Sequence, residues 1–203
     1  MGLQKSSDLQ YPTPIISERT TSGTIAIPSN IKRNQNNRAI VLIDAAPGGG
    51  GGAGDSTGPG AGGSVGECVT DYEIDVTDSI GGNLNITIGA AGATGNTGSN
   101  PGGDGGNTII KQNDDTTVIL ALQGGFGAED DSATSIGAGY WSAPGAAGSV
   151  PGGAVFVNSS NGGKGALSPI PGYGRAGCGR NADGSLGDYE AAAGVVRVKY
   201  WLK

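Results

Sequence analysis

The sequence predicts an all-β fold, a β-sandwich of jelly-roll-like type with glycine-rich loops gathered at one end. No window of eleven or more residues has helical periodicity, and several short segments alternate apolar and polar residues. Of the 42 glycines, all but Gly2 and Gly23 lie between Gly48 and Gly194. Because glycine in a regular element costs about 0.5 to 1 kcal/mol relative to alanine, this tract excludes a helical core. Close backbone packing, turns or association with identical chains must offset that cost.

The predicted strands follow one another along the chain. Residues 1–21 have neither a helical nor a strand period of apolar residues, which predicts an extended arm for attachment. One domain is predicted over residues 22–203. Residues 39–43 are a continuous apolar run, which predicts a strand buried on both faces. Period-two alternation is typical of half-buried strands and is clearest at residues 71–77 and 83–88. The other predicted strands are residues 24–27, 108–111, 117–122, 154–157 and 194–202.

The glycine tract has a local period of three. Gly89, Gly92, Gly95 and Gly98 recur at the spacing that a polyproline-II-type helix needs where neighbouring backbones approach one another. Pro101 stands where the next glycine of this period would fall, which excludes collagen. Compact loops and an array of packed polyglycine-II segments both remain compatible with the pattern.

Composition and charge exclude several classes of function. The net charge is −6, and the longest run of basic residues is Lys32-Arg33, so we expect no nucleic-acid partner. No apolar stretch approaches the roughly 18 residues of a membrane span, and residues 1–10 lack the apolar region of a signal peptide. We therefore expect no membrane insertion. We also expect that the chain is made in a cytoplasm, or that it reaches the outside without such a signal.

Catalytic and metal-binding motifs are scarce. The chain has no histidine, which removes the usual general base and the commonest zinc ligand, so we expect no enzyme and no cofactor. Residues 102–109 resemble one copy of a calcium-binding nonapeptide repeat, with Asn107 in place of aspartate, but such sites need stacked copies. A glycine turn is the alternative. Cys68 and Cys178 could form a disulfide or remain two thiols.

Aromatic residues in glycine-rich surroundings are the candidate binding residues. Tyr140 and Trp141 are flanked by glycine and proline, and Tyr173 and Arg175 form a second group of this kind. Aromatic faces on a rigid backbone stack on sugar rings or other receptor groups. The alternative for each group is packing over the sandwich or against a neighbouring subunit.

The order of strand-like and glycine-rich segments along the chain resembles that of the glycine-rich domain of phage tail fibre and receptor-binding proteins. In that family a short strand ending in proline precedes a hydrophobic strand and a run of glycines, and further strands lead into glycine turns before a closing strand. The matching segments are residues 22–28, 39–43, 45–52, 84–92, 102–108 and 193–201. Residues 32–38 are unusually polar for this family.

The resemblance implies a virion protein that recognises a bacterial surface glycan or outer-membrane component, often as a homotrimer. Residues 1–21 would then attach it to other virion proteins. The alternative is a capsid decoration or fibre-building protein without a receptor of its own. A bacterial surface protein of the glycine-rich kind is a third reading, which the missing signal peptide disfavours.

Overall fold

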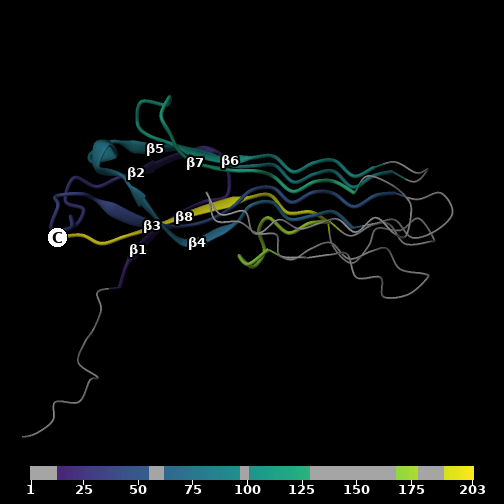
Figure 1. Ribbon diagram of the computed structural model, residues 1–203, viewed down its shortest axis with the longest axis horizontal. Helices are drawn as coiled ribbons and strands as arrows, with labels where there is room; N and C mark the ends of the chain where they lie inside the picture. The colour runs from purple at the N-terminus through teal and green to yellow at the C-terminus, as the bar shows by residue number, and fades with distance from the viewer. Residues whose placement is uncertain (1–12, 55–61, 97–100, 129–167, 178–189) are drawn as a thin grey trace, which may run out of the picture.

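The protein folds into a β-sandwich from which a bundle of glycine-rich segments projects (Figure 1). The computed structural model describes residues 13–54, 62–96, 101–128, 168–177 and 190–203. Eight strands form two four-stranded antiparallel sheets, with the orders β1-β8-β3-β4 and β2-β5-β6-β7. The strands are β1 Ile15–Arg19, β2 Gly23–Ala26, β3 Ile40–Ala46, β4 Val69–Asp75, β5 Asn83–Thr87, β6 Thr108–Lys111, β7 Val118–Leu122 and β8 Val195–Tyr200. The predicted all-β class is confirmed.

The core lies between the two sheets. Along β5, and along β8 from Val196 onward, every second residue is buried, so Leu84, Ile86, Val196 and Val198 turn toward the facing sheet. Each such side chain stabilises the fold by about 1.5 to 3 kcal/mol relative to an exposed one. One hydrophobic cluster joins residues of both sheets, which makes the sandwich a single packed unit.

Strand β3 differs in burial from the prediction. The apolar run predicted a strand buried on both faces, but within that run only the alternate, inward residues Ala39, Val41 and Ile43 are fully buried. Ile40, Leu42 and Asp44 on the outer face are partly exposed. This strand lies between β8 and β4, so its edges are hydrogen-bonded while one of its faces remains partly open.

Strand β1 lies within the predicted attachment arm. It pairs antiparallel with β8, from Ile15 opposite Tyr200 to Arg19 opposite Val196. Four of its five residues are exposed, so backbone pairing rather than side-chain burial holds this edge strand. The predicted strand at residues 154–157 lies outside the described residues.

Ion pairs cross the outer face of the first sheet. The Lys199 ammonium lies 2.6 Å from the Asp44 carboxylate and 2.7 Å from that of Asp71, and Arg197 pairs with Glu18. Partial burial alone would lower the pKa of Lys199, but hydrogen bonds to the two carboxylates outweigh it and raise that pKa. These pairs link all four strands of the sheet.

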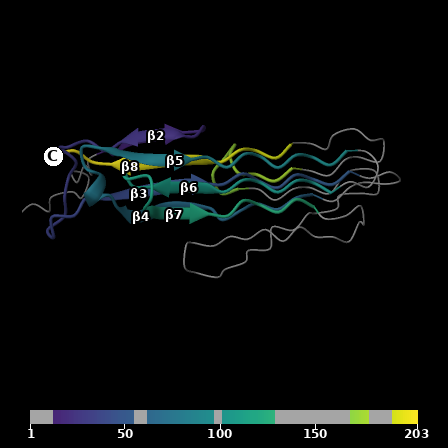
Figure 2. The same cartoon turned by 90° about the horizontal axis from the view of Figure 1, so that it is seen from above.

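The glycine-rich segments leave the sandwich at one end. Strands β3, β5 and β7 run toward that end and continue into outgoing segments, whereas β4, β6 and β8 receive returning ones. The segments lie side by side in both views (Figures 1 and 2). The prediction that the glycine-rich parts gather at one end of the sandwich therefore agrees with the structure.

Candidate functional site

The glycine-rich segments form a backbone array with one segment at its centre. The outgoing segments are residues 47–54, 88–96, 123–128 and 174–177, and the returning segments are residues 62–66, 101–107 and 190–194. Residues 48–54 are all buried and are hydrogen-bonded to each of the other six segments. Below, "the array" means these seven segments and "the central segment" means residues 47–54.

Hydrogen bonds of the central segment repeat every three residues. The N–H groups of Gly48 and Gly51 donate to one neighbour, at Gly106 (3.0 Å) and Gly103 (2.8 Å). Gly49 and Gly50 donate to two other neighbours. The carbonyls of residues 48–51 accept from Gly125, Gly92, Gly177 and Ala128 in turn. In packed polyglycine-II helices, the hydrogen bonds also join neighbouring segments and repeat every three residues. The central segment has this geometry.

The six outer segments close into a ring. Each is hydrogen-bonded to the next through backbone groups, which leaves no gap around the central segment. The bonds that join successive outer segments are Gly103 to Ala93, Gly105 to Gly125, Ser64 to Phe126, Gly63 to Gly177, Ala192 to Arg175 and Gly194 to Gly89, the donor given first.

Glycine is required in the central segment by space. A Cβ atom on Gly48 would lie 1.8 Å from the carbonyl oxygen of Ala90, and on Gly50 it would lie 1.9 Å from that of Phe126. Both contacts are far inside van der Waals separation and involve backbone, which cannot rotate away. None of the glycines of the central segment has a positive φ, so close approach, not left-handed backbone, demands glycine here.

Side-chain oxygens complete the array where backbone carbonyls do not reach. Asp104 Oδ1 accepts from the N–H of Gly127 at 2.8 Å, and Asn107 Oδ1 accepts from that of Gly124 at 2.9 Å. The two donors are three residues apart in the sequence, and so are the two acceptors. This is the same period as that of the hydrogen bonds of the central segment. The run that resembles a calcium-binding repeat therefore uses these two oxygens to bind a neighbouring segment.

Thr108 joins the sandwich to the array. Its buried hydroxyl accepts from the N–H of Gly89 at 3.0 Å and donates to the carbonyl oxygen of Ala46 at 3.1 Å. The hydroxyl thus bridges two outgoing segments at the point where β3 and β5 end. Sequence reasoning missed this residue, since a threonine at the start of a strand gives no distinctive signal.

Tyr173, a predicted binding residue, lies where the array meets the first sheet. Its ring packs against the buried cluster that contains Ile170 and Val195, and the Arg197 guanidinium lies 5.6 Å from its centroid. The ring is partly exposed. Gly174 has a φ of 62°, which continues the turn that places Tyr173 there.

Arg175 lies two residues further along the same segment. Its Nε donates to the carbonyl oxygen of Glu190 at 3.3 Å, on the neighbouring returning segment. Tyr173 and Arg175 are therefore on the flank of the array near the sheets, not at its far end. Tyr140 and Trp141 lie outside the described residues.

Cys68 is a buried thiol at the same junction. Burial raises its pKa to about 11, and the hydrogen bond between its thiol and the Ser168 hydroxyl only partly opposes this. Cys178, the other cysteine, lies outside the described residues.

The raised pKa predicts an unreactive thiol at Cys68. In a Cys178→Ser variant, we expect Ellman's reagent to react with the folded protein at pH 8 roughly 100-fold more slowly than with the protein in guanidinium chloride, because the thiolate fraction is small. Equal rates in the two conditions would show that the thiol is accessible and ionised. Absorbance at the released thionitrobenzoate band measures both rates.

Neither a metal-binding group nor a membrane span is found in the described part of the chain. No cluster of three or more histidine, cysteine, aspartate or glutamate side chains there is suited to hold a metal ion. The same residues contain no helix with the length and apolar character needed to cross a bilayer.

The comparisons with known proteins identify a family. A search of curated proteins finds no match to this chain. The family described as the glycine-rich domain matches residues 20–201, which covers the sandwich from β2 to β8, without β1, and includes every segment of the array. The chain therefore belongs to the glycine-rich domain family.

Proposed function

We propose that the protein is a bacteriophage virion component, a tail fibre or receptor-binding protein, that recognises a bacterial surface glycan or outer-membrane component. The array is the observation that carries this proposal. Its outgoing segments are described as far as Gly54, Asn96, Ala128 and Gly177, beyond the ends of the strands, and its hydrogen bonds are almost all between backbone groups. A scaffold of this kind tolerates sequence change in the connections between its segments, which suits recognition of variable receptors.

The four candidate binding residues differ in the role that we propose for them. Tyr140 and Trp141 belong to residues 129–167, the connection that follows Ala128, and are the main receptor-contacting candidates. Tyr173 and Arg175 are secondary candidates, because packing and hydrogen bonds already occupy part of each side chain. Residues near the N-terminus would attach the protein to other virion proteins. The proposal includes a homotrimer, no catalysis and no cofactor.

Removing the two aromatic rings tests the proposal. In a Tyr140→Ala, Trp141→Ala double variant, we expect binding to host cells to weaken at least tenfold, because aromatic anchors carry most of the affinity of such contacts. The measurement is the bound fraction of fluorescently labelled protein against cell density. The unfolding temperature and the solution mass should match those of the unsubstituted protein.

A matched control removes an exposed apolar side chain elsewhere. Val118→Ala on β7, where the side chain is about half exposed, should leave cell binding unchanged. If the double variant binds cells as well as the control, the two rings are not the receptor contact. If no tested host binds the unsubstituted protein and immunogold labelling finds it on the capsid shell, the decoration role replaces the receptor role.

A further inference from the structure

An apolar surface lies on the outer face of the first sheet, at the end away from the array. Strand register places Ile16, Lys199 and Leu42 side by side on this face. Strand residues alternate between faces, so Ile40, two residues before Leu42, lies on the same face. Trp201, two residues after Lys199 and just beyond the end of β8, lies on it too. Ile16 is 56% exposed, and the other three apolar side chains are partly exposed. Below, Ile16, Ile40, Leu42 and Trp201 are called the Trp201 surface.

A shallow cavity indents this surface. Its volume is about 160 Å³, and it is lined by Lys32, Arg33, Asn34, Ile40 and Trp201. This is large enough for one apolar side chain of leucine or phenylalanine size. The cavity has an aromatic wall, with cationic residues beside it. Protein–protein interfaces often have this composition, with an aromatic residue at the centre and charged residues around it.

The two cations at the cavity have no counter-charge within the part of the chain that the structure describes. Among the described residues no group pairs with the Lys32 ammonium, and the Arg33 guanidinium donates only to the neutral oxygens of Asn37, at 3.2 and 3.4 Å. By contrast, Arg38 in the same loop pairs with Asp75 at 2.6 Å. Two cations without a counter-charge among the described residues, in a chain of net charge −6, favour an acidic partner.

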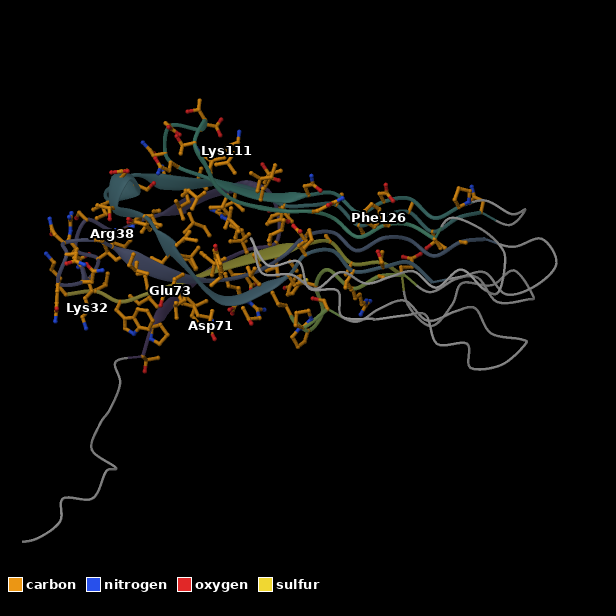
Figure 3. The ribbon with its side chains drawn as sticks, in the orientation of Figure 1. Lys32, Arg38, Asp71, Glu73, Lys111 and Phe126 are labelled. Atoms are coloured by element: carbon orange, nitrogen blue, oxygen red, sulfur yellow. The ribbon has the colours of Figure 1, made fainter. Side chains whose placement is uncertain are left out.

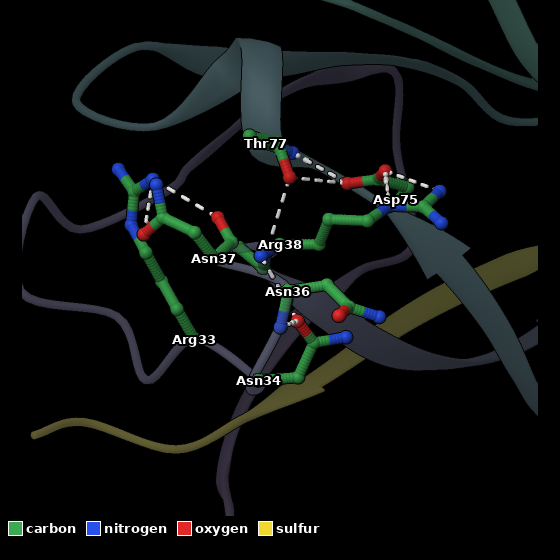
Figure 4. Close-up of polar contacts among 8 residues, drawn as sticks. Arg33, Asn34, Asn36, Asn37, Arg38, Asp75 and Thr77 are labelled. Atoms are coloured by element: carbon green, nitrogen blue, oxygen red, sulfur yellow. Dashed lines mark hydrogen bonds and ion pairs between the residues drawn. The ribbon is translucent and has the colours of Figure 1, made fainter.

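The loop that carries these cations is held in one conformation (Figure 4). Asn34 Oδ1 accepts from the backbone N–H groups of Asn36 and Arg38, both at 3.0 Å. Asn37 has a left-handed φ of 61°, a conformation that asparagine adopts more readily than most residues. The polar character of residues 32–38 therefore serves to order the loop.

The side of the loop that faces β4 is also fixed. Burial would raise the pKa of Asp75, but hydrogen bonds from Thr77 and the charge of Arg38 lower it, so the carboxylate stays ionised near neutral pH. The Thr77 hydroxyl also accepts from the N–H of Ala39 at 3.0 Å. A preformed loop loses little conformational entropy when a partner binds.

Both described chain ends lie at this end of the sandwich. Ile15 pairs with Tyr200, and the N–H of Lys203 donates to the carbonyl oxygen of Asn30. Figure 1 shows the C-terminus at the end opposite to the array, and Figure 3 shows Lys32 and Arg38 there. A partner bound at the Trp201 surface would leave the array uncovered.

We propose that the Trp201 surface binds an acidic segment of another protein, with one apolar side chain in the cavity and carboxylates opposite Lys32 and Arg33. The apolar surface extends past the cavity to Leu42 and, on the other side of the Lys199 side chain, to Ile16, further than one sugar ring covers, which favours a polypeptide over a glycan. This surface is separate from the array, so the inference stands whether or not the proposed receptor contacts are correct.

A pair of synthetic peptides tests the inference on the full chain. The probe is acetyl-Glu-Glu-Leu-Phe-Glu-Glu-amide, and its reference replaces each glutamate by glutamine. By isothermal titration, the acidic peptide should bind at least tenfold more tightly than the reference, and its affinity should fall as sodium chloride rises. A Lys32→Glu, Arg33→Glu double variant should lose at least tenfold in affinity for the acidic peptide.

Two further variants keep the outcome interpretable. Lys111→Glu makes the charge change of one of these two substitutions at a distant lysine that is paired with Asp115, and should leave peptide affinity unchanged. Lys32→Gln removes one exposed charge, should keep the unfolding temperature, and should weaken binding about threefold. The inference is overturned if both peptides bind equally, if the Lys32 variants bind as well as the unsubstituted protein, or if a hexuronate oligosaccharide binds where the acidic peptide does not.

Discussion

Gly50→Ala is expected to unfold the array and to lower the free energy of unfolding by at least about 4 kcal/mol. The added Cβ would lie 1.9 Å from the carbonyl oxygen of Phe126 and 2.3 Å from its carbonyl carbon. Relief requires one outer segment to move away from the centre, which breaks hydrogen bonds on both of its sides. Chemical denaturation followed by circular dichroism measures the change.

A second glycine provides the control. In Gly23→Ala, on the edge strand β2, the nearest atom to the added Cβ would be 3.8 Å away. That atom belongs to the flexible end of the Arg19 side chain. We expect a change within about 0.5 kcal/mol, since exposed substitutions without strain are usually near neutral. If Gly50→Ala is as well tolerated as Gly23→Ala, the close packing of the central segment is wrong.

Thr108→Val is expected to lower the free energy of unfolding by about 2 to 4 kcal/mol. Valine has nearly the same shape, but it leaves the N–H of Gly89 and the carbonyl oxygen of Ala46 without this buried partner. Each orphaned buried group costs about 1 to 3 kcal/mol. Equilibrium denaturation in urea gives the difference directly.

The same substitution at an exposed threonine separates the hydroxyl contacts from strand propensity. Thr87→Val on β5 is exposed, and valine is favoured in strands, so we expect no loss or a slight gain in stability. A Thr108→Val protein that unfolds at the same urea concentration as Thr87→Val would show that the hydroxyl bridge contributes nothing.

The strands with regular alternation were predictable, and β1 was not. At β5 and β8, apolar residues at every second position predicted both the strand and its inward face. Strand β1 has Ile15, Ile16, Glu18 and Arg19 exposed on an edge, and its pairing with β8 depends on backbone groups. Backbone pairing without burial leaves no hydrophobic period for sequence reasoning to find.

The array was only partly predictable for a related reason. The period of three at Gly89, Gly92 and Gly95 indicated polyglycine-II packing, but residues 48–52 are all glycine and have no period. The structure explains both patterns. A central segment with neighbours on every side needs glycine at nearly every position, whereas an outer segment such as residues 89–96 needs it only where it faces inward.

This packing changes the argument for oligomerisation. The glycine tract suggested that association with identical chains might be needed to offset its backbone entropy. Within one chain, the residues 48–51 already have every N–H and carbonyl group hydrogen-bonded, and each such bond contributes about 0.5 to 1.5 kcal/mol. A trimer is therefore not required by the glycine content and rests on the proposed virion role alone.

The candidate binding residues illustrate a different limit. Aromatic residues near glycine were read as receptor contacts or as packing, and for Tyr173 the structure provides a packing partner in Ile170 and a cation in Arg197. Composition alone could not place Tyr173 at the junction, because that position depends on the pairing of its segment with residues 190–194. The cavity at Trp201 likewise depends on strand register.

Amide hydrogen exchange of residues 48–51, followed by NMR on uniformly labelled protein, tests the polyglycine-II array most directly. The account predicts that these four glycine amides exchange within about tenfold of the core amides of β8, because each is buried and hydrogen-bonded to an outer segment. Exchange at the rate of an unstructured glycine peptide, with β8 still protected, would contradict it.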